Sequence, residues 1–170
     1  MTTRPNRLTI PECDPGSLKP NLDETNLISA PEKIFDAVLF SNFLTTCHSK
    51  ASDLKSFRDN AVVELQRIRK AGMAEIEDSF TKNPFSAGKV IRSYTWLTDS
   101  IIKSVWNICK IWLHPAPNPT EAEKLSIIAV GGYGRKEMAP YSDVDLLFLT
   151  PYKITPWAES VIETILYILW

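Results

Sequence analysis

Apolar residues recur every three or four positions through much of the chain, which is the spacing of one face of an α-helix. The pattern predicts two long amphipathic helices separated only by Asn83-Pro84-Phe85, and such a short connection favours an antiparallel hairpin. Gly72 interrupts the first of these stripes, at a cost of about 1 kcal/mol relative to alanine. We therefore expect a close helix contact there. The predicted helices cover residues 31–50, 52–80 with Ser52 as N-cap, and 86–112 with Ser86 as N-cap.

A different pattern begins after Pro115-Ala-Pro-Asn-Pro119, a proline-rich stretch that ends the third helix. Short runs at 125–130 and 143–150, the first β-branched and the second apolar, predict two strands, and residues 156–170 return to helical spacing. Two strands alone are marginally stable, so we expect the sheet to be completed outside this sequence. The prediction is an α+β fold with a disordered tail over 1–30, a helical region over 31–114, a linker over 115–124 and an incomplete domain over 125–170.

Composition limits the class of protein. The chain has 170 residues, 44% apolar and 23% charged, with a formal net charge of -1, as expected for an ordinary globular protein. That charge gives no electrostatic reason to expect a nucleic-acid partner. Three widely spaced cysteines favour neither a disulfide framework nor a zinc site, and no apolar run is long enough to span a membrane. We therefore expect a cytoplasmic protein without a membrane partner.

The most informative local feature is a glycine-rich turn, because three of the six glycines fall between Gly131 and Gly134. Glycine lets a backbone turn tightly and approach a ligand closely, and free amides at a helix start favour phosphate oxygens. Gly131 and Gly132 are the candidate phosphate-binding residues. Neither a dinucleotide fingerprint nor a Walker loop fits the spacing. A turn of purely structural role is the alternative for the glycines taken alone.

Two aspartates follow the turn at the start of the second predicted strand. In a strand, Asp143 and Asp145 would point to one side, with Val144 on the other. Their charges repel unless a cation lies between them, and Mg²⁺ fits, as a hard ion usually shared with substrate phosphates. The alternative is a pair of solvent-facing carboxylates on an edge strand. The combination with the glycine turn favours a magnesium site with Asp143 and Asp145 as ligands.

Other nearby side chains have two interpretations each. Arg135 would pair with a phosphate or bond local carbonyls, and Ser142 would donate to a phosphate or cap the strand. Tyr133 and Tyr141 would stack on a base or pack against the protein. The sequence leaves these alternatives open.

The segment Gly131-Gly-Tyr-Gly-Arg135 with Pro140-Tyr-Ser-Asp-Val-Asp-Leu-Leu-Phe148 resembles the DNA polymerase β-like nucleotidyltransferases. Within that superfamily it is similar to the bifunctional uridylyltransferase/uridylyl-removing enzymes. The resemblance implies transfer of UMP from UTP to a tyrosine of the PII nitrogen-signalling protein, with glycines on phosphates and aspartates on Mg²⁺. It also implies a third carboxylate on a later strand, which no position here supplies. Lys136 departs from the glycine often found in that family.

Three other functions stay open at the level of sequence. The first is another nucleotidyltransferase of the superfamily, such as the adenylyltransferase that acts on glutamine synthetase. The second is a non-catalytic remnant that serves as a helical interaction module. The third, a nucleotide-sugar glycosyltransferase with its own Asp-x-Asp pair, is disfavoured by the two adjacent glycines.

Overall fold

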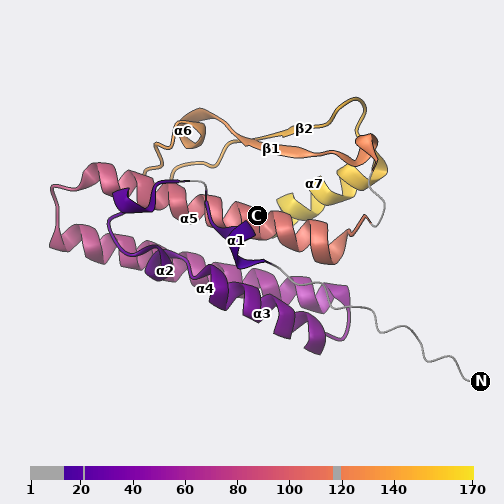
Figure 1. The fold of residues 1–170 in the computed structure, drawn as a ribbon, viewed down its shortest axis with the longest axis horizontal. Coiled ribbons are helices and arrows are strands. Elements are labelled where there is room, and N and C mark those ends of the chain that lie inside the picture. Colours follow the sequence, from indigo (N-terminus) through magenta and orange to yellow (C-terminus); the bar gives the residue numbers. More distant parts are fainter. Residues whose placement is uncertain (1–13, 21, 117–119) are drawn as a thin grey trace, which may run out of the picture.

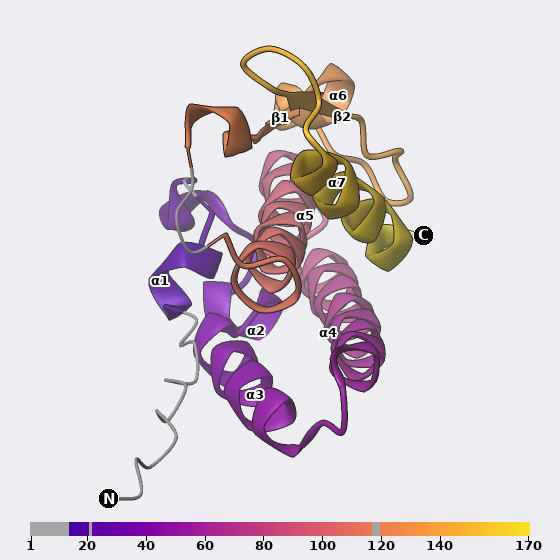
Figure 2. The same cartoon turned by 90° about the vertical axis from the view of Figure 1, so that its right-hand side faces the viewer.

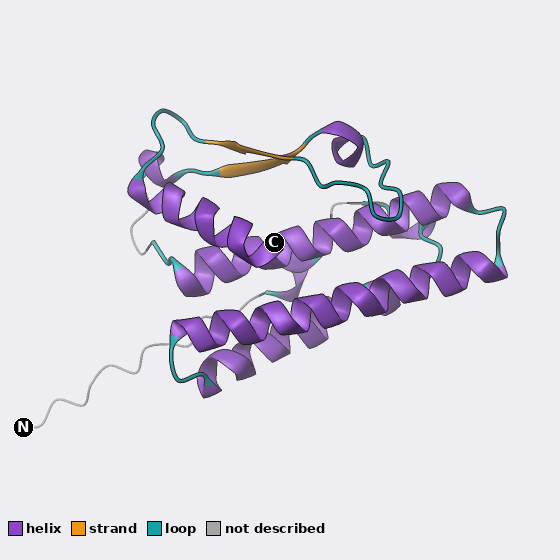
Figure 3. Ribbon diagram, turned by 180° about the vertical axis from the view of Figure 1, so that it is seen from behind, coloured by secondary structure: helices purple, strands orange, loops and turns teal. Residues whose placement is uncertain are grey.

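The computed structural model describes residues 14–20, 22–116 and 120–170, and its elements confirm the α+β prediction. Helices make up most of the fold, with one small antiparallel sheet on top (Figures 1 and 3). The helices are α1 (Pro15–Leu18), α2 (Pro31–Ile34), α3 (Ala37–Lys50), α4 (Leu54–Lys82), α5 (Ala87–Asn107), α6 (Gly131–Gly134) and α7 (Pro156–Leu169), and the strands are β1 (Ser126–Ala129) and β2 (Leu146–Leu149). Short 3-10 turns cover Glu24–Asn26 and Glu121–Glu123, and a π-helix, Ile108–Leu113, continues α5.

The predicted hairpin is confirmed, since α4 and α5 run antiparallel along the length of the molecule (Figure 1). Gly72 is buried at their contact, as expected from its cost in a helix interior. A Cβ there would collide with the carbonyl oxygen of Ile34 and would lie 2.9 Å from Leu97 Cδ1. The glycine therefore lets α4 approach both α2 and α5.

The predicted helix over 31–50 is wrong in one respect, because it is broken into α2 and α3. Phe35 is extended and buried, and Asp36 caps α3 by accepting a hydrogen bond from the Leu39 amide at 2.9 Å. Spacing alone did not reveal this break, since apolar positions on either side keep a helical period. The N-cap of α4 is Asp53 rather than Ser52, and Ser86 occupies the cap of α5 without a side-chain bond.

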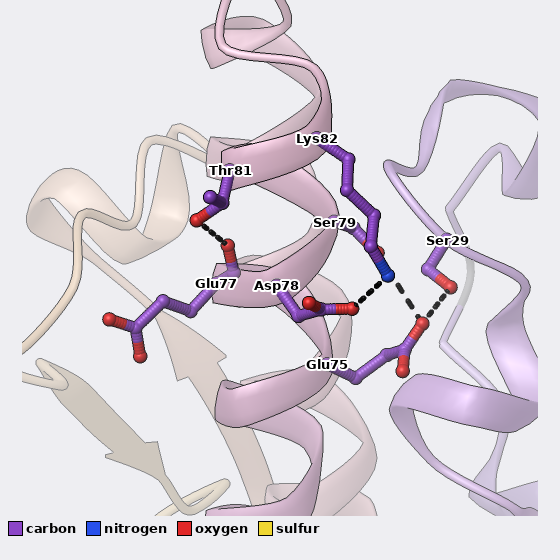
Figure 4. Close-up of polar contacts among 7 residues, drawn as sticks. All are labelled: Ser29, Glu75, Glu77, Asp78, Ser79, Thr81 and Lys82. Atoms are coloured by element: carbon purple, nitrogen blue, oxygen red, sulfur yellow. Dashed lines mark hydrogen bonds and ion pairs between the residues drawn. The ribbon is translucent and has the colours of Figure 1, made fainter.

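Residues 14–20 and 22–30, predicted to be part of a disordered tail, pack on the helices instead. Leu18 is fully buried, and the Ile28 amide donates to Ser93 Oγ of α5 at 2.9 Å. Ser29 Oγ donates to Glu75 of α4 at 2.5 Å, next to the Lys82–Asp78 ion pair (Figure 4). The segment has few apolar side chains, but these are enough to order it because they pack against a core that other elements form. The predicted tail over 1–13 lies outside the described residues.

The sheet lies on the side of α5 that faces away from α3, with α7 beside it (Figures 1 and 2). Ile127 pairs with Phe148 and Ala129 with Leu146, and these four side chains point inward. The neighbouring pair, Ile128 and Leu147, points outward. This register places the end of β1, and the glycine turn after it, beside the start of β2.

One hydrophobic core joins the helical region to the elements after the linker. Val161 and Ile165 of α7 are fully buried in the same cluster as Val105 of α5 and Trp112. Three linker residues, 117–119, lie outside the described part of the chain. None of the helices described by the structure is both long and apolar enough to cross a membrane.

Candidate functional site

The glycine turn forms a single helical turn, α6 (Gly131–Gly134), directly after β1. Val130 is extended, and Gly131 then adopts a left-handed φ of +62°. The first bond of α6 runs from the Gly134 amide to the Val130 carbonyl at 2.8 Å. The amides of Gly131 and Gly132 precede that bond and are not used by it, as at any helix start. The turn therefore leaves the amides of two consecutive glycines outside its own helical hydrogen bonding.

The carboxylate of Asp145 lies over this turn. A Cβ added to Gly131 would be 2.5 Å from Asp145 Oδ2, closer than real Cβ contacts. The backbones are also tied, because the Val130 amide donates to the Asp145 carbonyl at 3.1 Å. Only glycine satisfies both the positive φ of residue 131 and the proximity of this carboxylate.

The two aspartates precede β2 rather than lying within it, so the strand predicted from residue 143 is too long at its start. Asp143, Val144 and Asp145 are all exposed, and all three line one cavity. The strict alternation predicted for this segment is therefore wrong: Val144 does not face away from the aspartates into the core. Within the described part of the chain, neither carboxylate takes part in a hydrogen bond or an ion pair.

The cavity beside the aspartates has a volume of about 760 Å³. Its walls come from α4 and α5 of the helical region, from β2 and the segment that precedes it, and from the end of α7. The polar side chains that line it with the aspartates are Gln66, Arg69, Tyr94, Thr98, Tyr141 and Ser142. The helical region thus lines the space beside the aspartates, which the sequence did not indicate, whereas Gly131, Gly132 and Arg135 are not among the residues of its walls.

Tyr133 packs into the protein, which decides between the two interpretations left open by the sequence. Its side chain is buried, and its hydroxyl donates to Asp99 Oδ1 of α5 at 2.5 Å. Burial raises the pKa of the Asp99 carboxyl, and the Tyr133 hydrogen bond opposes that rise. Burial and the nearby Asp99 raise the pKa of the Tyr133 hydroxyl. Sequence reasoning missed Asp99, whose signal is a single carboxylate among the apolar positions of α5.

Arg135 and Ser142 make local contacts near the turn. Arg135 Nε donates to Glu137 at 2.9 Å, in an exposed ion pair. Ser142 Oγ accepts from the Ala139 amide at 3.0 Å and so caps the turn before Asp143. Both contacts are local, but Arg135 pairs with a carboxylate rather than with carbonyls, and Ser142 accepts within the turn rather than at the strand. The predicted roles of both residues in phosphate binding stay predictions.

The donor chemistry of the site fits Mg²⁺, although its protein ligands are few. Asp143 and Asp145 offer hard carboxylate oxygens, of which that of Asp145 lies beside the glycine turn, and Mg²⁺ is commonly held by one or two carboxylates together with substrate phosphates. Among the residues that the structure describes, no group of three or more histidine, cysteine, aspartate or glutamate side chains forms a metal site. The aspartate pair is therefore suited to a metal that arrives with a phosphate ligand.

Comparison with known proteins points to nucleotidyltransferases. A family profile described as glutamate-ammonia ligase adenylyltransferase matches residues 14–164. The chain is 47% identical over 137 residues to the bifunctional uridylyltransferase/uridylyl-removing enzyme of Ruegeria pomeroyi, covering 81% of this chain and 15% of that protein. It is 45% identical over 148 residues to the enzyme of the same name from Cereibacter sphaeroides, covering 86% of this chain and 16% of that protein. No solved structure matches the chain.

Proposed function

Because this chain belongs to the glutamate-ammonia ligase adenylyltransferase family of nucleotidyltransferases, we propose that its glycine turn and aspartate pair bind a nucleoside triphosphate with Mg²⁺. The proposed reaction is transfer of UMP from UTP to a tyrosine of a PII protein, with pyrophosphate as the leaving group. The chain spans 15–16% of the length of the two curated relatives quoted above. We accordingly assign to this chain only the part of the active site that binds the donor nucleotide.

The observation that carries the proposal is the contact between Asp145 and Gly131. A carboxylate alone beside phosphate-binding amides would repel the phosphates, whereas a carboxylate that shares a cation with them attracts them. The 2.5 Å approach of Oδ2 to the Cβ position of Gly131 brings the two functions together. Neither feature by itself would distinguish this turn from a structural one.

Each group has a defined task in the proposal. The amides of Gly131 and Gly132 donate to phosphate oxygens. Arg135 would also pair with these oxygens once its ion pair with Glu137 breaks. Asp143 and Asp145 would hold Mg²⁺, which when bound would neutralise phosphate charge and favour departure of pyrophosphate. Ser142 holds the preceding turn and thereby fixes where Asp143 begins.

The choice of UTP rests on the relatives, which are named uridylyltransferases at 45–47% identity. ATP is the second candidate donor, since the family profile that matches most of the chain is described as an adenylyltransferase. The two donors share the triphosphate and Mg²⁺, so the turn and the aspartates do not discriminate between them. Cytoplasmic location follows from the proposed substrates.

The test is titration calorimetry of the chain with UTP and with ATP, in Mg²⁺ and in EDTA. We expect UTP to bind only with Mg²⁺, at least tenfold more tightly than ATP, and Asp143→Asn to weaken UTP binding at least tenfold, which is about 1.4 kcal/mol. Asp59→Asn, an exposed aspartate on α4, is the matched control and should bind like the wild type. We expect this chain alone to be poorly active, so transfer of label from radioactive UTP to an added PII protein is measured with a full-length enzyme that contains this segment, where Asp143→Asn should abolish it.

Three results would contradict the proposal or parts of it. Equal binding of UTP with Mg²⁺ and with EDTA would refute the metal assignment. Tighter binding of ATP than of UTP would favour the adenylyltransferase alternative. Absence of binding by either nucleotide would favour the interaction module without catalytic function.

A further inference from the structure

A buried hydrogen bond connects the glycine turn to the long helix α5. Tyr133, the third residue of α6, donates from its hydroxyl to Asp99 Oδ1 at 2.5 Å across 34 residues of sequence. The Tyr133 side chain is only 4% exposed, and it packs with Ile102 of α5 and Met138 in a small cluster separate from the main core. A charge-assisted bond in such surroundings is stronger than a neutral one at the surface.

The other hydrogen bonds around the turn stay within it or connect it to the segment just before β2. Gly134 bonds to Val130, Glu137 bonds to Gly132 at 2.9 Å, and Val130 bonds to Asp145. These contacts hold the turn to the sheet but leave open how it sits relative to the helical region. Among the polar contacts of α6 in the described residues, Tyr133–Asp99 is the one that reaches α5.

We propose that Tyr133 and Asp99 are positioning residues that hold the phosphate-binding amides of the turn in place against α5. The inference rests on the proposed function, because it assigns to the pair a role in binding of the nucleotide. Neither side chain contacts the nucleotide in this proposal. Asp99 acts through Tyr133, and Tyr133 acts through the backbone of α6.

The physical reason is that a four-residue helix has little rigidity of its own. Amides bind a phosphate more tightly when they are already fixed in the bound geometry, because the free energy of binding then includes no cost of ordering them. No other side chain of α6 can fix the turn in place, because its residues other than Tyr133 are glycines. Tyr133 is the side chain of the turn that anchors it.

The experiment measures local opening and nucleotide affinity in the same variants of this chain. Amide hydrogen exchange by NMR is followed at Val130, Gly134 and Glu137, and binding of UTP with Mg²⁺ is followed by calorimetry. Tyr133→Phe removes the donor, and Asp99→Ala removes the acceptor. Asp99→Asn retains an acceptor oxygen. Thr164→Val is the matched control, since it removes the half-buried Thr164–His114 bond of 2.8 Å on α7, away from the turn.

We expect exchange at the three turn amides to become roughly tenfold faster in Tyr133→Phe and in Asp99→Ala. The affinity for UTP with Mg²⁺ should fall in the same two variants, also roughly tenfold. Asp99→Asn and Thr164→Val should stay within about twofold of the wild type in both measurements. The double variant Tyr133→Phe/Asp99→Ala should resemble either single variant, because both remove one interaction.

The outcomes separate this inference from the proposed function. Unchanged exchange at the turn in Tyr133→Phe overturns the inference, and so does faster exchange with unchanged affinity for UTP. Equal effects of Thr164→Val on the turn would show general loosening and would also overturn it. If the wild-type chain binds no UTP while the turn amides respond as expected, the proposed function fails and the anchoring of the turn by the pair stands.

Discussion

The carboxylate of Asp145 rests against the Cα of Gly131, with Oδ2 2.5 Å from the position that a Cβ would take. The two residues are fourteen positions apart and meet because β1 and β2 pair in antiparallel register, with Ala129 opposite Leu146. Gly131 also has a φ of +62°, which disfavours any side chain. The glycine turn and Asp145 are consequently one structural unit.

Replacement of Gly131 tests this unit. Gly131→Ala should lower the free energy of unfolding by about 1–3 kcal/mol, from the left-handed backbone and the collision with Asp145. It should also weaken binding of UTP with Mg²⁺, because Asp145 must move. Urea denaturation and calorimetry measure the two effects. Gly132→Ala is the control for stability, since its Cβ would meet the nearest atom at 3.6 Å, and equal losses in both variants would contradict the explanation.

Two glycines in long helices should respond to alanine with opposite signs. Gly72→Ala should lower the free energy of unfolding by about 1–3 kcal/mol, because its Cβ collides with the Ile34 carbonyl and crowds Leu97. Gly88→Ala, in the first turn of α5, has no atom within 4 Å and should raise it by up to about 1 kcal/mol. Thermal and urea unfolding of both variants check the signs. A gain in stability for Gly72→Ala would contradict this explanation, because it would show that α2 shifts to accommodate the added Cβ at little cost in free energy.

Lys136 occupies a position that suits glycine. Its φ is +62°, in the left-handed region, which glycine adopts more readily than lysine. Lys136→Gly should therefore raise the free energy of unfolding by about 0.5–1 kcal/mol. Arg135→Gly is the comparison, because Arg135 has a φ of -85°, and it should lower stability. A loss of stability in Lys136→Gly would mean that the lysine side chain makes a compensating contribution.

The buried Asp99 should make stability depend on pH. Burial raises the pKa of the Asp99 carboxyl above its ordinary value, so folding shifts this group toward its neutral form relative to the unfolded chain. Its contribution to stability is then greatest below the unfolded pKa and decreases as pH rises through the folded pKa. The stability of the wild type minus that of Asp99→Asn should fall from about pH 3 upward, then level off. Urea denaturation at a series of pH values measures this difference, and a difference that rises with pH would refute the sign.

Much of the helical scaffold was predictable because its signals are local. Periodicity predicted the α4–α5 hairpin, the helix α7 and two strands, and the unusual Gly72 predicted the tight contact at its position. The break at Phe35–Asp36 was missed, since apolar spacing continues across it. The packing of residues 14–20 and 22–30 was missed because it depends on a surface that distant helices create.

The sequence by itself determined the residues that are candidates for chemistry, since a glycine turn and an Asp-x-Asp pair are recognisable from type and spacing. Tertiary structure alone decided that Asp145 lies on Gly131, that Asp143 precedes the strand, that Tyr133 is buried on Asp99, and that α4 and α5 form walls of the cavity. The physical reason is the range of the interactions involved. Propensity and capping act over a few residues, whereas strand register and helix packing bring together side chains that no local pattern connects.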